Sequence, residues 1–268
     1  MIQKLKKHTA LIGLIFTVAA ALFTVGMTWV AYVDQTAYAR MQTFLYDCGI
    51  DAIGVLVAAG LYYGCMRQEG EGTEAFRTLN VFVSASFVAN FLLYYTVGVS
   101  AWKGLTFTFT LLSKLIDLVM IYYFYQYMRR TLGFEGKLAE WTERCIPYLL
   151  ALESLVVLSN IFYPTTFLID QTGMYQATGA SVLEDIYLIA ASLVTTILIL
   201  RSKRPQNQKV AGLTFIFLPL INYIMVGGTF GNASQYGMIL VSLIIISRTA
   251  SSILPLCLFC NAEAGRRY

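Results

Sequence analysis

The residues best placed to do chemistry in this sequence are four charged side chains that fall inside long apolar runs. They are Lys114, Asp117, Glu153 and Arg248. A charge in the middle of a membrane-spanning helix is costly unless it pairs inside the bundle. Lys114 and Asp117 are three residues apart, so they share a helix face and can neutralise each other. Glu153 and Arg248 then form a predicted pair between helices, and an ion-pair clamp explains this network as well as a functional site does.

Enzymatic chemistry has few residues to draw on. His8 is the only histidine, so a haem site or a zinc hydrolase would lack its usual ligands. Cys257 and Cys260 have the spacing of a redox or zinc motif, but no further ligands lie nearby, which favours ordinary small residues at a helix end. We therefore predict no catalytic residue, no metal site, no cofactor and no enzymatic activity.

The composition identifies the elements that position these residues. Hydrophobic residues make up 57% of the chain and charged residues 13%, whereas soluble domains carry about 25% charged residues. The sequence therefore predicts a single membrane domain over residues 1–268, with the lipid bilayer as its main partner. Eight apolar runs are long enough for helices that cross a membrane, and their continuity excludes the alternating pattern of a membrane barrel. The runs are Thr9–Val33, Leu45–Cys65, Leu79–Val99, Leu105–Met128, Ile146–Tyr163, Val182–Leu200, Val210–Val226 and Gly237–Cys257.

The distribution of Lys and Arg predicts the orientation, because basic residues are retained on the cytoplasmic side of short loops. A cytoplasmic N-terminus places the basic segments Lys4–Lys7, Arg129–Arg130 and Arg201–Lys209 inside, and leaves Arg40 and Lys103 outside. We predict an all-α, polytopic bundle of eight transmembrane helices with both termini in the cytoplasm. The net charge of +4 follows from this orientation, so no nucleic-acid partner is expected.

The longest outer loop of this topology is FYPTTFLIDQTGMYQATGAS, residues 162–181, between the fifth and sixth predicted helices. Thr165–Ile169 is β-prone, Asp170–Gly173 is a turn signal, and Met174–Gln176 can return as a second strand. The pattern predicts a small extracellular hairpin over the bundle, with an Asx-type turn anchored by the carboxylate of Asp170. A disordered connector is the alternative.

A second set of polar residues lies near the outer ends of the predicted helices. Its acids face the side from which an external ligand arrives, and they predict a pocket for a cationic or hydroxylated ligand beneath the loop. Acids at an outer helix N-terminus are also stabilised by the helix dipole, which needs no ligand. The candidate ligand-binding residues, including two from the loop, are Asp47, Asp51, Asp170, Tyr175, Glu184, Asp185 and Tyr187.

The loop resembles the outer loop, of the form F-Y-I-D-x-x-G-x-Y-x-x-G, of the seven-helix N-terminal membrane region of bacterial signalling proteins that end in a GGDEF diguanylate cyclase or a histidine kinase. The order of elements over residues 40–257 is also similar. This resemblance implies a sensory input module in a bacterial cytoplasmic membrane, for an extracellular or membrane ligand of unspecified identity. The matching residues are Phe167, Ile169, Asp170, Gly173, Tyr175 and Gly179.

Two departures from that family affect the interpretation. The run at 9–33 is predicted to be an extra, uncleaved N-terminal helix, because it exceeds the usual length of a signal core; a signal peptide cleaved after Ala39 is the alternative. The sequence ends at Tyr268, where the family begins its output domain. We expect either an input module that works through a partner, such as a cytoplasmic output domain or a second copy, or a truncated product.

Three function classes remain at this point. A sensory, receptor-like input module predicts a lid loop and an inner end that transmits motion. A small membrane transporter predicts broken helices and duplicated halves; Pro219 and Gly227–Gly228 can break a helix, but the first half has no matching feature. A membrane enzyme predicts clustered His, Asp or Cys at one face. The sensory module is the preferred prediction.

Overall fold

The computed structural model describes residues 2–33, 45–66, 71–204, 206, 209, 210, 213 and 216. This part of the chain is mostly helical, and four of its helices are long and apolar enough to cross a membrane. The four segments are His8–Val30, Gly72–Thr96, Ser100–Leu132 and Lys137–Ile161. The structure therefore agrees with the prediction of an all-α membrane bundle.

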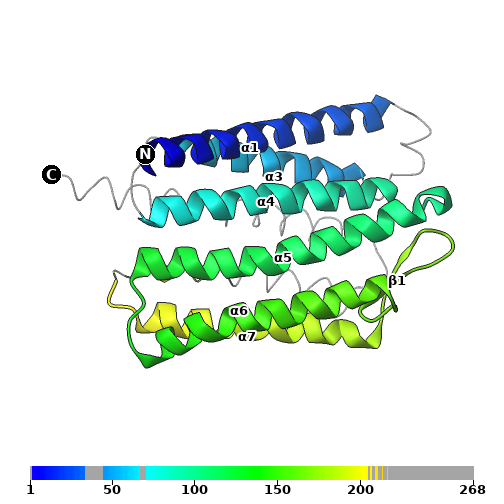
Figure 1. Ribbon diagram of the computed structural model, residues 1–268. Helices are drawn as coiled ribbons and strands as arrows, with labels where there is room; N and C mark the ends of the chain where they lie inside the picture. The colour runs from blue at the N-terminus through cyan, green and yellow to red at the C-terminus, as the bar shows by residue number, and fades with distance from the viewer. Residues whose placement is uncertain are drawn as a thin grey trace. The chain divides into compact units, whose positions relative to one another are not determined.

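Within the described residues, six α-helices follow the predicted apolar runs, and a two-stranded sheet interrupts them (Figure 1). Three short 3-10 helices flank the turns and the sheet. The elements are α1 Ile2–Val33, α3 Leu45–Gly64, α4 Glu71–Thr96, η1 Ser100–Trp102, α5 Lys103–Leu132, α6 Lys137–Leu158, η2 Ser159–Ile161, β1 Phe167–Ile169, β2 Tyr175–Ala177, η3 Gly179–Ser181 and α7 Val182–Arg201.

The helices differ from the apolar runs at their ends. Helix α4 begins at Glu71 and not at Leu79, and α6 begins at Lys137 and not at Ile146. A helix can extend beyond its apolar run, because polar residues are also compatible with helical structure. The start of an apolar run therefore does not mark the first helical residue. Helix α6 also ends at Leu158, before the predicted Tyr163, because the chain tightens into η2.

The chain divides into two compact units. The first comprises Met1–Tyr127 and Glu140–Ala191, and the second comprises Met128–Ala139 and Ser192–Tyr268. In the second unit, Lys203 Nζ lies 3.8 Å from Glu135 Oε2, and both side chains are largely exposed, so this ion pair adds little stability. The candidate site lies within the first unit.

In the first unit, α1, α3 and α4 pack through small residues. Ala20, Ala21 and Val55 form a buried cluster, and a Cβ on Gly54 would lie only 2.5 Å from the ring of Phe87. Close approach over small side chains is the usual way in which membrane helices associate, because lipid removes the hydrophobic drive between them. A second cluster joins α5, α6 and α7 through Leu118, Val157 and Tyr187.

Large aromatic side chains are exposed near the start of α6 and just beyond its end. Trp141 near its start is 61% exposed, and Phe162 just beyond its end is 92% exposed. At 1.5 Å per residue, these positions are about 30 Å apart, which matches the hydrocarbon core of a bilayer. Exposed aromatic rings favour the boundary between lipid and water. The hairpin follows Phe162 directly, so it begins just beyond the apolar segment Lys137–Ile161.

Candidate functional site

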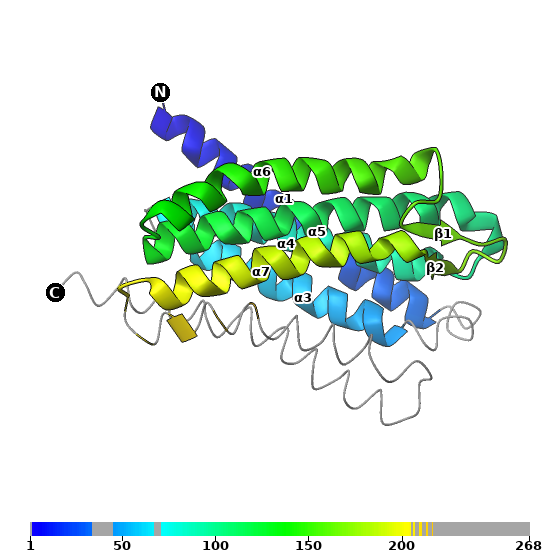
Figure 2. The same ribbon diagram turned by 90° about the horizontal axis from the view of Figure 1, so that it is seen from below.

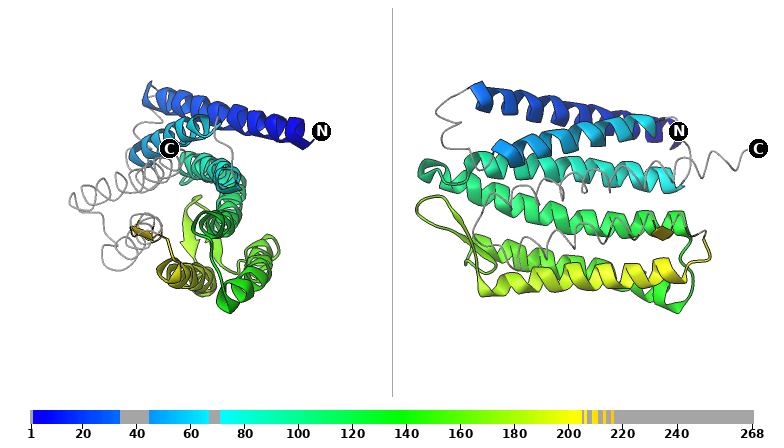
Figure 3. Two further views of the ribbon diagram at one scale, coloured as in Figure 1. Left: turned by 90° about the vertical axis from the view of Figure 1, so that its left-hand side faces the viewer. Right: turned by 180° about the vertical axis from the view of Figure 1, so that it is seen from behind.

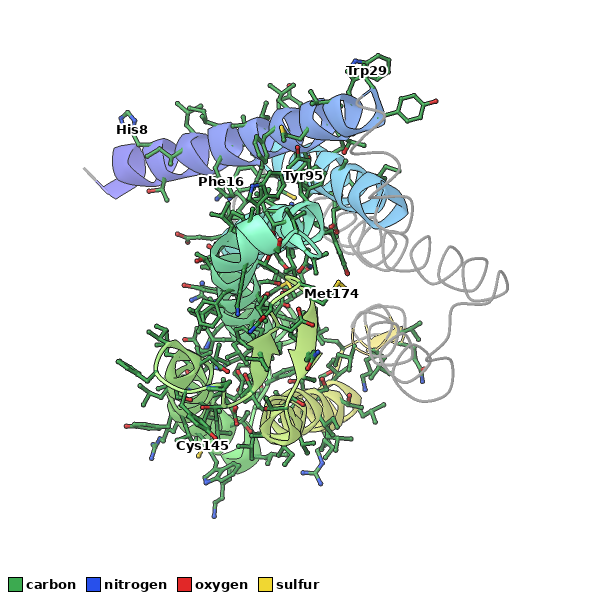
Figure 4. All side chains as sticks on the ribbon, turned by 90° about the vertical axis from the view of Figure 1, so that its right-hand side faces the viewer. His8, Phe16, Trp29, Tyr95, Cys145 and Met174 are labelled. Carbon is green, nitrogen blue, oxygen red and sulfur yellow. The ribbon has the colours of Figure 1, made fainter. Side chains whose placement is uncertain are left out.

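The site begins with the loop between α6 and α7, which is a β-hairpin, as the sequence predicts. Strands β1 and β2 pair antiparallel, with Leu168 opposite Gln176. The hairpin lies at the end of the first unit where α4 ends and α5 begins, and the N-terminus of α1 lies at the opposite end (Figures 1 and 2). Two further views place its strands between α5 and α7 (Figures 3 and 4).

The turn of the hairpin is organised by Asp170. Its Oδ1 accepts hydrogen bonds from the backbone N–H of Thr172 at 2.8 Å, the hydroxyl of Thr172 at 2.6 Å and the N–H of Met174 at 3.0 Å. Its Oδ2 accepts a hydrogen bond from Gln176 Nε2 at 3.2 Å. This confirms the predicted Asx-type turn. Both oxygens of the carboxylate therefore accept hydrogen bonds from residues of the hairpin itself.

The charge of Asp170 strengthens these bonds. The hydrogen bond from the Thr172 hydroxyl, followed by the bond from the Met174 backbone, lowers the pKa of the Asp170 carboxyl below its usual value. Hydrogen bonds donated to a carboxylate stabilise its ionised form and so lower the pKa of the carboxyl. The group is therefore an anion at neutral pH, when its oxygens accept hydrogen bonds best.

Asn160 anchors the entry to the hairpin. Its buried Oδ1 accepts hydrogen bonds from the N–H groups of Thr166 at 2.9 Å and Phe167 at 3.1 Å, and its Nδ2 donates to the Thr166 hydroxyl at 2.9 Å. The amide oxygen thus accepts hydrogen bonds from backbone N–H groups that have no partner in the two-stranded sheet. From the sequence, Asn160 marks only an inward helix face. Its position five residues before the β-prone segment is the signal that points to an anchor.

The exit of the hairpin is tied to its entry. Thr178 donates its backbone N–H to the carbonyl of Thr166 at 3.1 Å and its hydroxyl to the carbonyl of Thr165. Ser159 on η2 donates to the Thr165 hydroxyl at 2.7 Å. The base of the hairpin is therefore closed on both sides, which leaves the turn as its far end.

That turn docks on the connection between α4 and α5. Gly98 donates its N–H to the carbonyl of Gly173 at 3.0 Å. Gly173 has φ +85°, and a Cβ there would lie 2.8 Å from the carbonyl oxygen of Val99. Next to it, Met174 Sδ lies 3.4 Å from where a Cβ of Gly98 would be; Figure 4 labels Met174 in this region. Glycine is needed at 173 for both the backbone angle and the close approach.

The inner side of the hairpin carries two stacked aromatic rings. Phe167 on β1 is fully buried, and its ring centroid lies 6.0 Å from that of Tyr175 on β2, with the planes 24° apart. The ring centroid of Phe107 on α5 also lies 5.4 Å from that of Phe167. The hairpin therefore enters the bundle as a hydrophobic plug whose polar turn stays at the surface.

Lys114 of α5 meets this plug. Its Nζ lies 5.8 Å from the ring centroid of Phe167 and 5.9 Å from that of Tyr175, which is within the range of a cation–π interaction. Side chains on a helix point back toward its N-terminus, and the N-terminus of α5 is at the hairpin end. The ammonium is thus raised from its position in the apolar segment toward the hairpin. We call Lys114, Phe167 and Tyr175 the lysine–aromatic cluster.

The other predicted charges have different surroundings. Asp117 Oδ1 accepts a hydrogen bond from Ser86 of α4 at 2.6 Å, and one turn away Ser113 donates to Asn90 Oδ1, also at 2.6 Å. These two bonds hold α5 against α4. Glu153 lies close enough to Tyr187 to interact with it electrostatically. Arg248 lies outside the described residues, so its pairing with Glu153 stays a prediction, as does the pairing of Lys114 with Asp117.

The candidate ligand-binding residues are only partly brought together. Asp170 and Tyr175 belong to the hairpin, and Tyr187 is buried in the cluster between α5, α6 and α7. Asp51 is 6% exposed on α3. Asp47, Glu184 and Asp185 lie in α3 and α7, and the structure describes only their backbone. Ligand binding by this set stays a prediction. The lysine–aromatic cluster, which joins two of the predicted residues to Phe167, is the feature that the sequence does not reveal.

Comparisons with protein-family models, with curated proteins and with solved structures find no match for this chain.

The docked turn leads to a direct prediction. Gly173→Ala should undock the hairpin, because a residue with a Cβ pays about 1–2 kcal/mol for a left-handed backbone and would also overlap Val99. Hydrogen exchange of the amides in residues 166–178 should accelerate by roughly tenfold or more. Gly179→Ala is the matched control, because a Cβ there meets nothing within 4 Å. Equal exchange in the two variants would contradict the docking of the turn.

Proposed function

We propose that this chain is a sensory, receptor-like input module of bacterial signal transduction, and that it detects an extracellular signal through the hairpin. The observation that carries the proposal is the lysine–aromatic cluster. The hairpin is at one boundary of the apolar layer, while the ammonium that its rings contact belongs to a residue within the apolar segment Ser100–Leu132. A change at the hairpin therefore acts directly on a charge inside the bundle.

Helix α5 is suited to carry such a change. It runs unbroken from Lys103 beside the hairpin to Leu132, and its last turn holds Arg129 and Arg130. A ligand shifts a receptor only by the difference in its affinity for two states. In this proposal the two states differ in whether the hairpin rings contact Lys114, and the ligand favours one of them.

The proposal includes the full topology that the sequence predicts. Eight helices cross a bacterial cytoplasmic membrane, both termini are cytoplasmic and the hairpin is outside. The basic residues in the last turns of α5 and α7 support this orientation, because Arg129, Arg130 and Arg201 then lie inside. The resemblance of the loop to those of bacterial signalling proteins supports a cytoplasmic output for the signal, either a diguanylate cyclase or a histidine kinase.

Cysteine labelling in intact cells tests the orientation. In a background without the native cysteines, Gln171→Cys in the turn should react with a membrane-impermeant maleimide from outside. Gln206→Cys, an exposed position after α7, should react only after permeabilisation. Labelling of Gln206→Cys in intact cells, or protection of Gln171→Cys, would overturn the topology.

A chimaera tests the sensory role. The chain, fused to a diguanylate cyclase reporter, should change its output when cells are exposed to conditioned culture medium. Asp170→Ala removes the acceptor of the turn bonds and should reduce this response several-fold at equal expression. Gln171→Ala, at the exposed neighbouring position, should respond like the parent. A full response from a folded Asp170→Ala variant would contradict the role of the hairpin in sensing.

A further inference from the structure

We propose that the paired rings of Phe167 and Tyr175 form a binding site for an organic ammonium ion, and that Lys114 is the internal cation that holds this site until the ligand arrives. This inference rests on the proposed sensory function and names the chemical class of its signal. The site is the inner face of the hairpin, and the ligand competes with the Lys114 ammonium for the same rings.

The geometry of the rings is that of a cation site. Two aromatic rings lie nearly equidistant from one ammonium, at 5.8 and 5.9 Å, and Phe107 packs against Phe167 with its ring centroid 5.4 Å away. Aromatic faces attract cations electrostatically, and clusters of such faces recognise methylated ammonium groups. A lysine ammonium already in this position shows which charge the rings accept.

The rings also connect the interior to the surface. Phe167 is fully buried, whereas Tyr175 is 38% exposed and every residue of β2 is exposed. A ligand can therefore approach over Tyr175 before it reaches Phe167. Because the hairpin is closed at its base by Asn160 and Thr178, the docked turn is the part that can lift to admit it.

A carboxylate on the same helix can receive Lys114 when a ligand displaces it from the rings. Asp117 lies three residues beyond Lys114 on one face of α5, so it offers the displaced ammonium a carboxylate at close range. An external cation at the rings therefore leaves the displaced Lys114 ammonium within reach of a carboxylate.

The rings further select an organic cation over a metal ion. Small inorganic cations require oxygen ligands to replace their hydration shell, whereas the surfaces offered here are the aromatic faces of Phe167 and Tyr175. A tetraalkylammonium group is weakly hydrated and presents methyl groups that pack against such rings. Choline and tetramethylammonium are therefore suitable probes.

Binding to the purified full-length chain in nanodiscs tests the proposal. Choline should bind the parent, whereas 3,3-dimethylbutan-1-ol, its uncharged isostere, should not. Lys114→Met keeps the length of the side chain and removes the competitor, so choline affinity should rise by about tenfold if Lys114 occupies the rings about nine-tenths of the time. Lys103→Met, at the exposed start of α5, is the control and should leave affinity unchanged.

Substitutions of the ring provide an independent readout if Lys114→Met does not fold. Tyr175→Leu should lower choline affinity by about tenfold or more, and Tyr175→Phe, which keeps the aromatic face, should retain it. Equal binding of choline and its isostere, or equal affinity in Tyr175→Leu and Tyr175→Phe, would overturn the site. The assay contains no output domain, so choline binding without a response in the chimaera would reject the sensory role alone.

Discussion

The structure depends on how one ammonium group is accommodated in an apolar layer. Lys114 lies well inside α5, where a charge loses the solvation that water provides. Part of the compensation comes from the faces of Phe167 and Tyr175, whose negative potential attracts the ammonium. These rings come from the loop between α6 and α7 and not from a neighbouring helix. The interaction therefore links the loop to the interior of the bundle.

This requirement explains why a short two-stranded hairpin is fixed at so many points. Isolated hairpins of this size are marginally stable, yet the rings have to stay over Lys114. Asn160 supplies acceptors for the first strand, Asp170 organises the turn, and Gly173 accepts a hydrogen bond from Gly98. Each anchor uses a polar group that the strand pairing alone would leave unsatisfied. The turn is held at one backbone contact, whereas the base is closed by several side chains.

The sequence predicts the elements better than it predicts the site. Runs such as Leu105–Met128 locate α5 because continuous apolarity over that length requires a helix in lipid. The turn at Asp170 is predictable because its hydrogen bonds are local in sequence. The contact of Lys114 with Phe167 is not, since it joins residues far apart whose approach depends on how α5 and α6 pack. Pattern analysis assigns Lys114 to its helix neighbour Asp117 for the same reason: only local spacing is visible in a sequence.

A double-mutant cycle between Lys114 and Tyr175 tests the central claim most directly. The parent, Lys114→Met, Tyr175→Leu and the double variant would be compared by hydrogen exchange of the hairpin amides in nanodiscs. If the ammonium and the ring interact, the two losses in hairpin stability should fail to add by about 0.5–2 kcal/mol. Losses that add to within about 0.3 kcal/mol would show that the hairpin is stabilised independently of Lys114, and would contradict the account.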